Sequence, residues 1–147
     1  MIAARPARPD DLPGIQALLR QLGYETRPDD LAERLRHLAA TGTDPILVAT
    51  DGSRCVGVLA LHIARMLQLD RPAARITTLV VASDSRGRSV GRHLVEAATA
   101  LAARAGCGRL ELTTGLARTG AHAFYRALGF TQTALHFSRR LDDRPMP

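Results

Sequence analysis

One stretch of this sequence constrains the fold more than any other: an apolar run, a glycine-bearing loop and an amphipathic helix follow one another directly. Residues 76–81 are β-branched or apolar throughout, which is typical of a central strand that is covered on both faces. Gly87 and Gly91 punctuate the loop, and residues 90–105 then carry apolar side chains at helical spacing up to Gly106. The succession predicts an α/β fold in which a buried strand leads through the loop to the start of a helix.

The rest of the chain shows strand and helix patterns in a regular order. A helix is expected at 12–22, with Gly23 at its end. A second is expected over the leucine stripe of 31–38, where Asp29 or Asp30 can cap the helix, and a third around 121–128, before Gly129. The second and third strands are joined by an Asp-Gly hairpin turn, and strands are expected at 2–8, 46–49, 56–61, 75–81, 110–114 and 131–139. The order is β-α-α-β-β-β-α-β-α-β, which we interpret as a single domain over 1–147 with a flexible tail at 142–147.

The chain is strongly basic, with a formal net charge of +6 and a sequence pI near 10.8. A basic field attracts polyanions, so a nucleic-acid-binding protein is one alternative, which salt-sensitive binding of DNA or RNA would identify. However, all 20 basic residues are scattered arginines, and two Tyr, three Phe and no Trp leave little aromatic surface on which bases could stack. We therefore expect no nucleic-acid partner.

The cysteines and the apolar runs argue against other classes of protein. Cys55 and Cys107 have neither a second cysteine nor a histidine at metal-ligand spacing, so we expect reduced thiols and no metal site. The N-terminus lacks the apolar stretch of a signal peptide, and the sequence has no run of about 18 apolar residues that could span a membrane. We expect a cytoplasmic protein without a membrane partner.

The loop after residues 76–81 has the chemistry of an anion site. The first turn of a helix presents unpaired N–H groups and a partial positive charge, and glycine lets the backbone approach a phosphate closely. Arg86, Arg88 and Arg92 add charge at the same place. The alternative is a polar turn in which Ser89 and water cap the helix. The sequence lacks the Gly-Lys-Ser/Thr of a P-loop and the third glycine of a dinucleotide fingerprint, so neither of these phosphate motifs applies.

Two motifs resemble those of the GNAT superfamily of N-acetyltransferases. Arg86-x-x-Ser89-x-Gly91 is similar to the superfamily signature Arg/Gln-x-x-Gly-x-Gly/Ala, and residues 118–130 are similar to its last helix, with Ala-x-x-Phe-Tyr and Leu-Gly-Phe. With the element order, the resemblance spans most of residues 2–141. It implies an α/β (α+β) fold with a mixed, mostly antiparallel twisted sheet of six to seven strands flanked by four helices. It also implies acetyl transfer from acetyl-CoA, used as a co-substrate without a metal, to a primary amine of a small molecule or peptide.

The resemblance assigns roles to individual residues. It implies that Leu79, Val80 and Val81 pair with the pantetheine arm through main-chain groups, and that the Val81 N–H faces the thioester oxygen. Tyr125 matches the general acid that returns a proton to the CoA thiolate, although an ordinary core aromatic is the alternative. The pyrophosphate would lie against the loop backbone, and the residues implied in coenzyme binding also include Arg86, Gly87, Arg88, Ser89, Val90, Gly91, Arg92 and Arg118.

Three positions depart from the family pattern. Ser89 replaces the first glycine, and Arg118 replaces an asparagine that touches CoA in many members. Thr77 and Thr78 occupy the strand on which many members place a carboxylate, so the base that deprotonates the amine is unassigned among Glu111, Glu25 and His62. The alternative function is a catalytically idle acyl-CoA-binding sensor or partner module.

The sequence leaves the acceptor amine open among amino sugars, amino acids, polyamines and protein N-termini. Acidic side chains and a tyrosine occupy the loop and second helix that often wall the acceptor side in this superfamily. They could attract a cationic amine, although helix capping and contact with water is the simpler interpretation for Tyr24, Glu25, Asp29, Asp30 and Glu33. A homodimer is an assembly that the resemblance alone suggests.

Overall fold

The computed structural model describes residues 1–145, and the chain forms two compact units, Met1–Leu112 and Thr113–Pro147. The first unit contains the β-sheet and three α-helices, and the described part of the second contains one α-helix. Whether the two units act as a single domain over 1–147 stays a prediction. Of the tail expected at 142–147, residues 146 and 147 lie outside the described residues.

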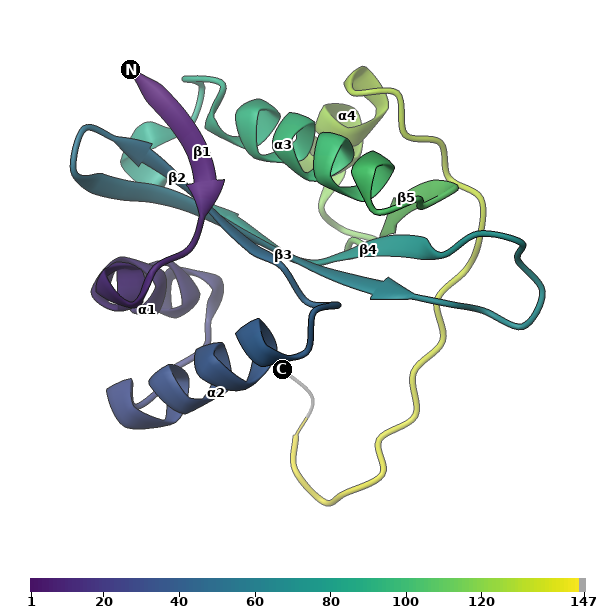
Figure 1. Cartoon of the computed structure of the whole chain (residues 1–147), viewed down its shortest axis with the longest axis horizontal. Coiled ribbons are helices and arrows are strands. Elements are labelled where there is room, and N and C mark those ends of the chain that lie inside the picture. Colours follow the sequence, from purple (N-terminus) through teal and green to yellow (C-terminus); the bar gives the residue numbers. More distant parts are fainter. Residues whose placement is uncertain (146–147) are drawn as a thin grey trace. The chain divides into compact units, whose positions relative to one another are not determined.

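A five-stranded sheet runs through the first unit in the order β1-β2-β3-β4-β5, as Figure 1 shows. Neighbouring strands are antiparallel from β1 to β4, and β5 joins β4 in parallel orientation. The expected mixed, mostly antiparallel sheet is therefore confirmed. The strands are β1 (Ile2–Pro6), β2 (Ile46–Asp51), β3 (Arg54–Ala64), β4 (Ala73–Val81) and β5 (Arg109–Leu112).

The expected number of six to seven strands is wrong for residues 1–145, which form five. The strand expected at 131–139 is missing, and these residues are exposed and belong to no ladder. Their loose alternation of polar and apolar side chains suits a strand. However, a strand also needs a neighbour that pairs with its N–H and C=O groups, and alternation carries no information about such a neighbour.

The four expected helices are confirmed, namely α1 (Leu12–Leu22), α2 (Pro28–Ala40), α3 (Val90–Arg104) and α4 (Thr119–Ala127). Gly23 closes α1 with a φ of 109°, a backbone conformation that glycine adopts without steric cost. The expected cap of α2 is wrong: the N-cap is Arg27, and Asp29 and Asp30 lie in the first turn. Pro28 explains the earlier start, because its fixed φ and missing N–H suit the first helical position.

Helices cover both faces of the sheet in the first unit. In Figure 1, α1 and α2 lie on one side of the sheet and α3 on the other, and β4 contacts both α1 and α3. The expectation that the central strand is covered on both faces is thus confirmed. Two short 3-10 helices, η1 (Pro9–Asp11) and η2 (Ser83–Ser85), join β1 to α1 and β4 to the loop before α3.

A bulge in the β2–β3 hairpin sends two nearby residues of β3 to opposite faces. The register shifts between Ala49 and Thr50, whose partners are Gly57 and Cys55, so one residue of β3 is skipped. Cys55 then lies against Gly14 of α1, whereas Gly57 lies against α3. The bulge therefore lets one strand pack against a helix on each side.

Candidate functional site

One edge of β4 is open over the second half of the strand. β3 pairs with β4 as far as Val81, but β5 pairs with β4 only from Ala73 to Ile76. Residues 77–81 therefore have no ladder partner on the β5 side within the first unit. An extended chain placed along this edge could form main-chain hydrogen bonds, as peptides do when they add a strand to a sheet.

The hydrogen-bond pattern of the β3–β4 pair determines which groups face the open edge. The Ala82 N–H donates to the Val56 carbonyl at 2.8 Å, while Val81 lies opposite Gly57. This pattern makes Val81 and Gly57 a non-hydrogen-bonded pair, so the N–H and C=O of Val81 point away from β3. Leu79, two residues earlier, has the same orientation, and the main-chain groups of Val80 point toward β3.

The start of α3 carries amides without acceptors. The His93 N–H donates to the Ser89 carbonyl at 3.1 Å and is the first amide bonded back to the N-cap. The Ser89 side chain makes no capping hydrogen bond, so the alternative of a helix capped by this hydroxyl does not hold. The N–H groups of Val90, Gly91 and Arg92 thus have no acceptor among residues 1–145 and can receive an anion.

The loop reaches α3 through two residues with positive φ. Gly87 has a φ of 78° and Ser89 a φ of 64°, with a ψ of 19° for Ser89. Ser89 is the only non-glycine residue of the described chain with positive φ. Serine therefore adopts the left-handed conformation for which the signature uses glycine, at a cost of about 1 kcal/mol.

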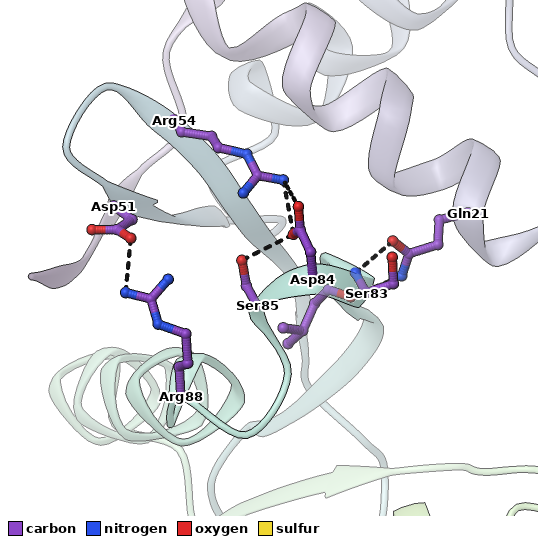
Figure 2. A network of polar contacts seen from close by, with 8 residues as sticks. Gln21, Asp51, Arg54, Ser83, Asp84, Ser85 and Arg88 are labelled. Carbon is purple, nitrogen blue, oxygen red and sulfur yellow. Dashed lines mark hydrogen bonds and ion pairs between the residues drawn. The ribbon is translucent and has the colours of Figure 1, made fainter.

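Ion pairs hold two residues between β4 and α3, Asp84 and Arg88 (Figure 2). Arg88 Nη2 lies 2.9 Å from Asp51 Oδ2, and Arg54 Nη2 donates to both oxygens of Asp84 at 2.8 Å. The Arg54 hydrogen bond is the largest cause of the lowered pKa of Asp84. The pKa of Asp51 is also lowered, first by the N-terminal ammonium and then by Arg88.

Two loop arginines differ from Arg88 in their surroundings. Arg86 and Arg92 are exposed and form no ion pair within residues 1–145, although both flank the unpaired amides. Their charge is thus available to an anion at the start of α3.

Gln21 connects α1 to the end of β4. Its Nε2 donates to the Val81 carbonyl at 2.8 Å, and its Oε1 accepts from the Ser83 N–H at 2.9 Å. Figure 2 shows the carboxamide directed at Ser83 from the neighbouring helix. Sequence reasoning did not select Gln21, because periodicity and motif spacing contain no signal for a contact across 60 residues.

Tyr125 lies in the second unit, on α4, where the end of the helix holds its ring. The Phe130 N–H donates to the Tyr125 carbonyl at 3.0 Å, and Gly129 has a φ of 91°. This is a Schellman motif, which brings the residue after the glycine against the last helical turn. The Phe130 and Phe124 rings meet Tyr125 edge to face, at centroid distances of 5.9 and 5.2 Å.

The protonation of Tyr125 follows from its burial. Burial raises the pKa of the Tyr125 hydroxyl, and Arg118 lowers this pKa to a smaller extent. The hydroxyl is therefore protonated through neutral pH and can serve as an acid. Arg118 is exposed at the N-cap of α4.

Two of the three candidate bases lie far from the end of β4. His62 and Glu111 both lie opposite Arg75, six residues before Val81. A strand rises about 3.3 Å per residue, so about 20 Å separates them from Val81. Neither side chain spans this distance. His62 instead bonds Asp44, with 2.7 Å between Nδ1 and Oδ1.

The acidic residues around α2 and the neighbouring Tyr24 face water, but none of them caps the helix, whose N-cap is Arg27. Tyr24, Glu25, Asp29, Asp30 and Glu33 are all exposed. Glu25 Oε2 lies 3.4 Å from Arg20 Nε, a distance typical of a solvated surface pair.

Residues 1–145 contain neither a candidate metal cluster nor a candidate membrane-spanning helix. In this part of the chain, no three His, Cys, Asp or Glu side chains gather closely enough to hold a metal ion. No helix in the same range has both the length and the apolar character needed to cross a membrane.

Comparison with protein families gives one match over most of the chain. The model of the acetyltransferase (GNAT) family matches residues 12–130. A relative from Salmonella typhimurium, named aminoalkylphosphonate N-acetyltransferase, is 29% identical over 145 residues, which cover 93% of this chain and 90% of the relative.

Two solved structures share the fold. A protein from Agrobacterium tumefaciens, named only provisionally as an acetyltransferase, has a TM-score of 0.87 and 32% identity, with 94% of this chain and 99% of that chain covered. Glucosamine-6-phosphate N-acetyltransferase from Arabidopsis thaliana has a TM-score of 0.85 at 21% identity, with 97% and 99% covered.

Proposed function

Because this chain belongs to the GNAT family of acetyltransferases, we propose that it transfers an acetyl group from acetyl-CoA to a primary amine of a small molecule or peptide, by direct attack in a ternary complex. One observation carries the proposal: an open strand edge leads through the loop to three unpaired amides at the start of α3. Main-chain groups suited to an extended arm and to a diphosphate thus follow one another along the chain.

The chain's own groups suit the coenzyme in two places. The amides of Val90, Gly91 and Arg92 would hold the pyrophosphate, with Arg86, Gly87, Arg88 and Ser89 shaping the loop around it. Arg118 would contribute a further cation. Leu79 and Val81 would bond the pantetheine arm through the main-chain groups that face the open edge, and Val80 would line this edge while it pairs with β3.

The reaction needs a hydrogen-bond donor that stabilises negative charge on the thioester oxygen and an acid that protonates the departing CoA sulfur. As the amine nitrogen bonds to the acyl carbon and the carbon–sulfur bond breaks, the Val81 N–H stabilises the charge that grows on the thioester oxygen, with the Leu79 N–H on the same edge. The attacking nitrogen loses a proton to water, and Tyr125 gives its hydroxyl proton to the departing thiolate and regains one from water. The raised pKa of Tyr125 supports this role, because the hydroxyl still holds its proton at neutral pH.

We propose aminoalkylphosphonates as the acceptor class. The support is the Salmonella relative of that name, which aligns with nearly the whole of both chains. The net charge of +6 also favours an acceptor that carries a phosphonate dianion. A cytoplasmic location, a homodimer and a single acyltransferase domain over both units are further proposals, and the family match across residues 12–130 supports the last.

Release of free CoA tests the proposed function. Purified protein is mixed with acetyl-CoA and 2-aminoethylphosphonate, and free thiol is measured against ethylphosphonate, which lacks the amine, and ethanolamine, which lacks the phosphonate. We expect turnover with 2-aminoethylphosphonate and none with ethylphosphonate. Binding of acetyl-CoA without thiol release, for this amine and for a panel of amino sugars, amino acids and polyamines, would favour the idle sensor instead.

A further inference from the structure

We propose that Gln21 is a positioning residue for acetyl transfer, which holds the end of β4 so that the open edge and the loop keep the orientation that the reaction needs. This inference rests on the proposed function. It concerns a residue of α1, outside the motifs that identify the family and outside the loop that would contact the coenzyme.

The two hydrogen bonds of Gln21 reproduce the bonding of a neighbouring strand. One carboxamide donates to the C=O of Val81 and accepts from the N–H of Ser83, two residues later. In a parallel ladder a single residue of the adjacent strand bonds its neighbour in this way. Gln21 therefore supplies the ladder partner that β5, which stops pairing at Ile76, does not provide.

The position of these bonds gives them a role in the site. The Val81 carbonyl points to the open edge and accepts the Gln21 hydrogen bond. The main-chain groups of Leu79 and the Val81 N–H are then the groups on this edge that remain available to an arm. Gln21 thus marks where the edge ends. It also fixes the peptide plane that joins Val81 to Ala82, whose N–H bonds Val56 on the other side. The chain leaving β4 is then held from both directions.

Other contacts hold the loop farther on, but not the strand. The Arg54 pair holds Asp84, and the Asp51 pair holds Arg88. The residues that these ion pairs hold, Asp84 and Arg88, both follow Ser83 in the chain (Figure 2). Among residues 1–145, Gln21 is the side chain that hydrogen-bonds the main chain of the last residue of β4. Loss of Gln21 would leave the loop anchored while the Val81 peptide could rotate.

The surroundings of Gln21 argue that its role is not chiefly to stabilise the fold. Gln21 is exposed and lines a cavity of about 300 Å³ together with Ser83 and Asp84. Hydrogen bonds at an exposed position add little to the free energy of unfolding, because water replaces them. In contrast, a small displacement of a reacting or stabilising group can lower a rate by about 100-fold.

Two substitutions distinguish the effects of the two Gln21 hydrogen bonds. Gln21→Leu removes both. Gln21→Glu keeps an acceptor for the Ser83 N–H but places a carboxylate against the Val81 carbonyl, where no donor remains. Gln16→Leu is the matched control, since Gln16 lies on the same helix and its Nε2 donates to a different main-chain carbonyl, that of Thr26, at 2.9 Å.

The experiment measures kcat and KM with the amine that the wild-type protein acetylates fastest, together with the dissociation constant for acetyl-CoA by calorimetry and hydrogen exchange at the Ser83 amide. For Gln21→Leu we expect kcat to fall about 10- to 100-fold, with faster exchange at Ser83. For Gln21→Glu we expect the same fall in kcat with the Ser83 amide still protected. Gln16→Leu is expected to stay within about twofold of wild type in kcat.

Two outcomes would overturn the inference in distinguishable ways. Wild-type kcat in both Gln21 variants would overturn the role of Gln21 and leave the proposed function intact. A wild-type protein that neither binds acetyl-CoA nor releases CoA would overturn the proposed function, and the inference with it.

Discussion

Ser89 combines a strained backbone with a place in the anion-binding loop. Its φ of 64° lies in a region that disfavours residues with a Cβ. We expect Ser89→Gly to raise the free energy of unfolding by about 1 kcal/mol, because glycine enters this region without the steric cost. Urea unfolding followed by circular dichroism measures the change. Ser89→Ala is the control, since it removes the hydroxyl but keeps the Cβ; equal stabilisation by Ala and Gly would contradict a backbone cause.

Asp11 makes stability depend on acid pH. It is 8% exposed, and it accepts hydrogen bonds from Nη1 and Nη2 of Arg5 at 2.8 and 2.9 Å and from the Arg8 N–H at 2.7 Å. The Arg5 hydrogen bond is the largest cause of the lowered pKa of Asp11 in the folded chain. The stabilising effect is therefore complete above the ordinary carboxyl pKa of about 3.9 and is lost as the pH falls through the lower folded pKa.

The Asp11→Asn substitution tests this dependence. We expect it to lower the free energy of unfolding by about 2 kcal/mol at pH 7, because charged hydrogen bonds in a buried setting are replaced. The difference from wild type should shrink when urea unfolding is repeated below about pH 4. Asp10→Asn serves as the comparison, since Asp10 is exposed. A difference that stays constant with pH would contradict the assignment.

Tyr125 offers the simplest experimental test of the proposed chemistry. We expect Tyr125→Phe to lower kcat about 100-fold without changing the thermal midpoint, because the acid for the thiolate is lost while the ring packing stays. The raised pKa of Tyr125 also predicts that wild-type turnover falls at strongly alkaline pH, where the hydroxyl loses its proton. The chain offers a control in its other tyrosine, Tyr24, which is 47% exposed. Equal effects of the two substitutions would exclude Tyr125 as the acid.

At the scale of elements, α1 owes its close approach to β3 to a glycine. A Cβ at Gly14 would lie 2.6 Å from the Cys55 Cβ, closer than two carbon atoms can pack. We expect Gly14→Ala to destabilise the protein by about 1–3 kcal/mol, although alanine is normally the better helix former. The same substitution at Gly120 of α4, where nothing lies within 4 Å, should instead stabilise by up to about 1 kcal/mol. Unfolding in urea gives both signs, and stabilisation by Gly14→Ala would contradict the packing.

Helices, which depend on side-chain spacing and end residues a few positions apart, could be predicted from the sequence. Contacts that join segments far apart in the chain could not. α1 and α3 follow from leucine spacing and a terminal glycine, which act within a few residues. The strand expected at 131–139 does not form, because pairing depends on a neighbour that alternation does not identify. Gln21 was missed for a similar reason. Its contacts with Val81 and Ser83 join segments about 60 residues apart, without a motif at either end.

At the scale of the whole molecule, the two halves of the family signature lie in different units. The strand, loop and α3 belong to Met1–Leu112, and Tyr125 belongs to Thr113–Pro147. The sequence identified the family from both halves, and the match over residues 12–130 includes both. The central physical claim concerns the first unit alone: the unpaired amides at the start of α3 receive the diphosphate of the coenzyme.

Titration of isotope-labelled protein with CoA, followed by amide NMR, tests this claim most directly. We expect saturable shifts, with one CoA per chain, that are largest at the N–H groups of Val90, Gly91 and Arg92. Saturable binding that leaves these three amides unchanged would contradict it.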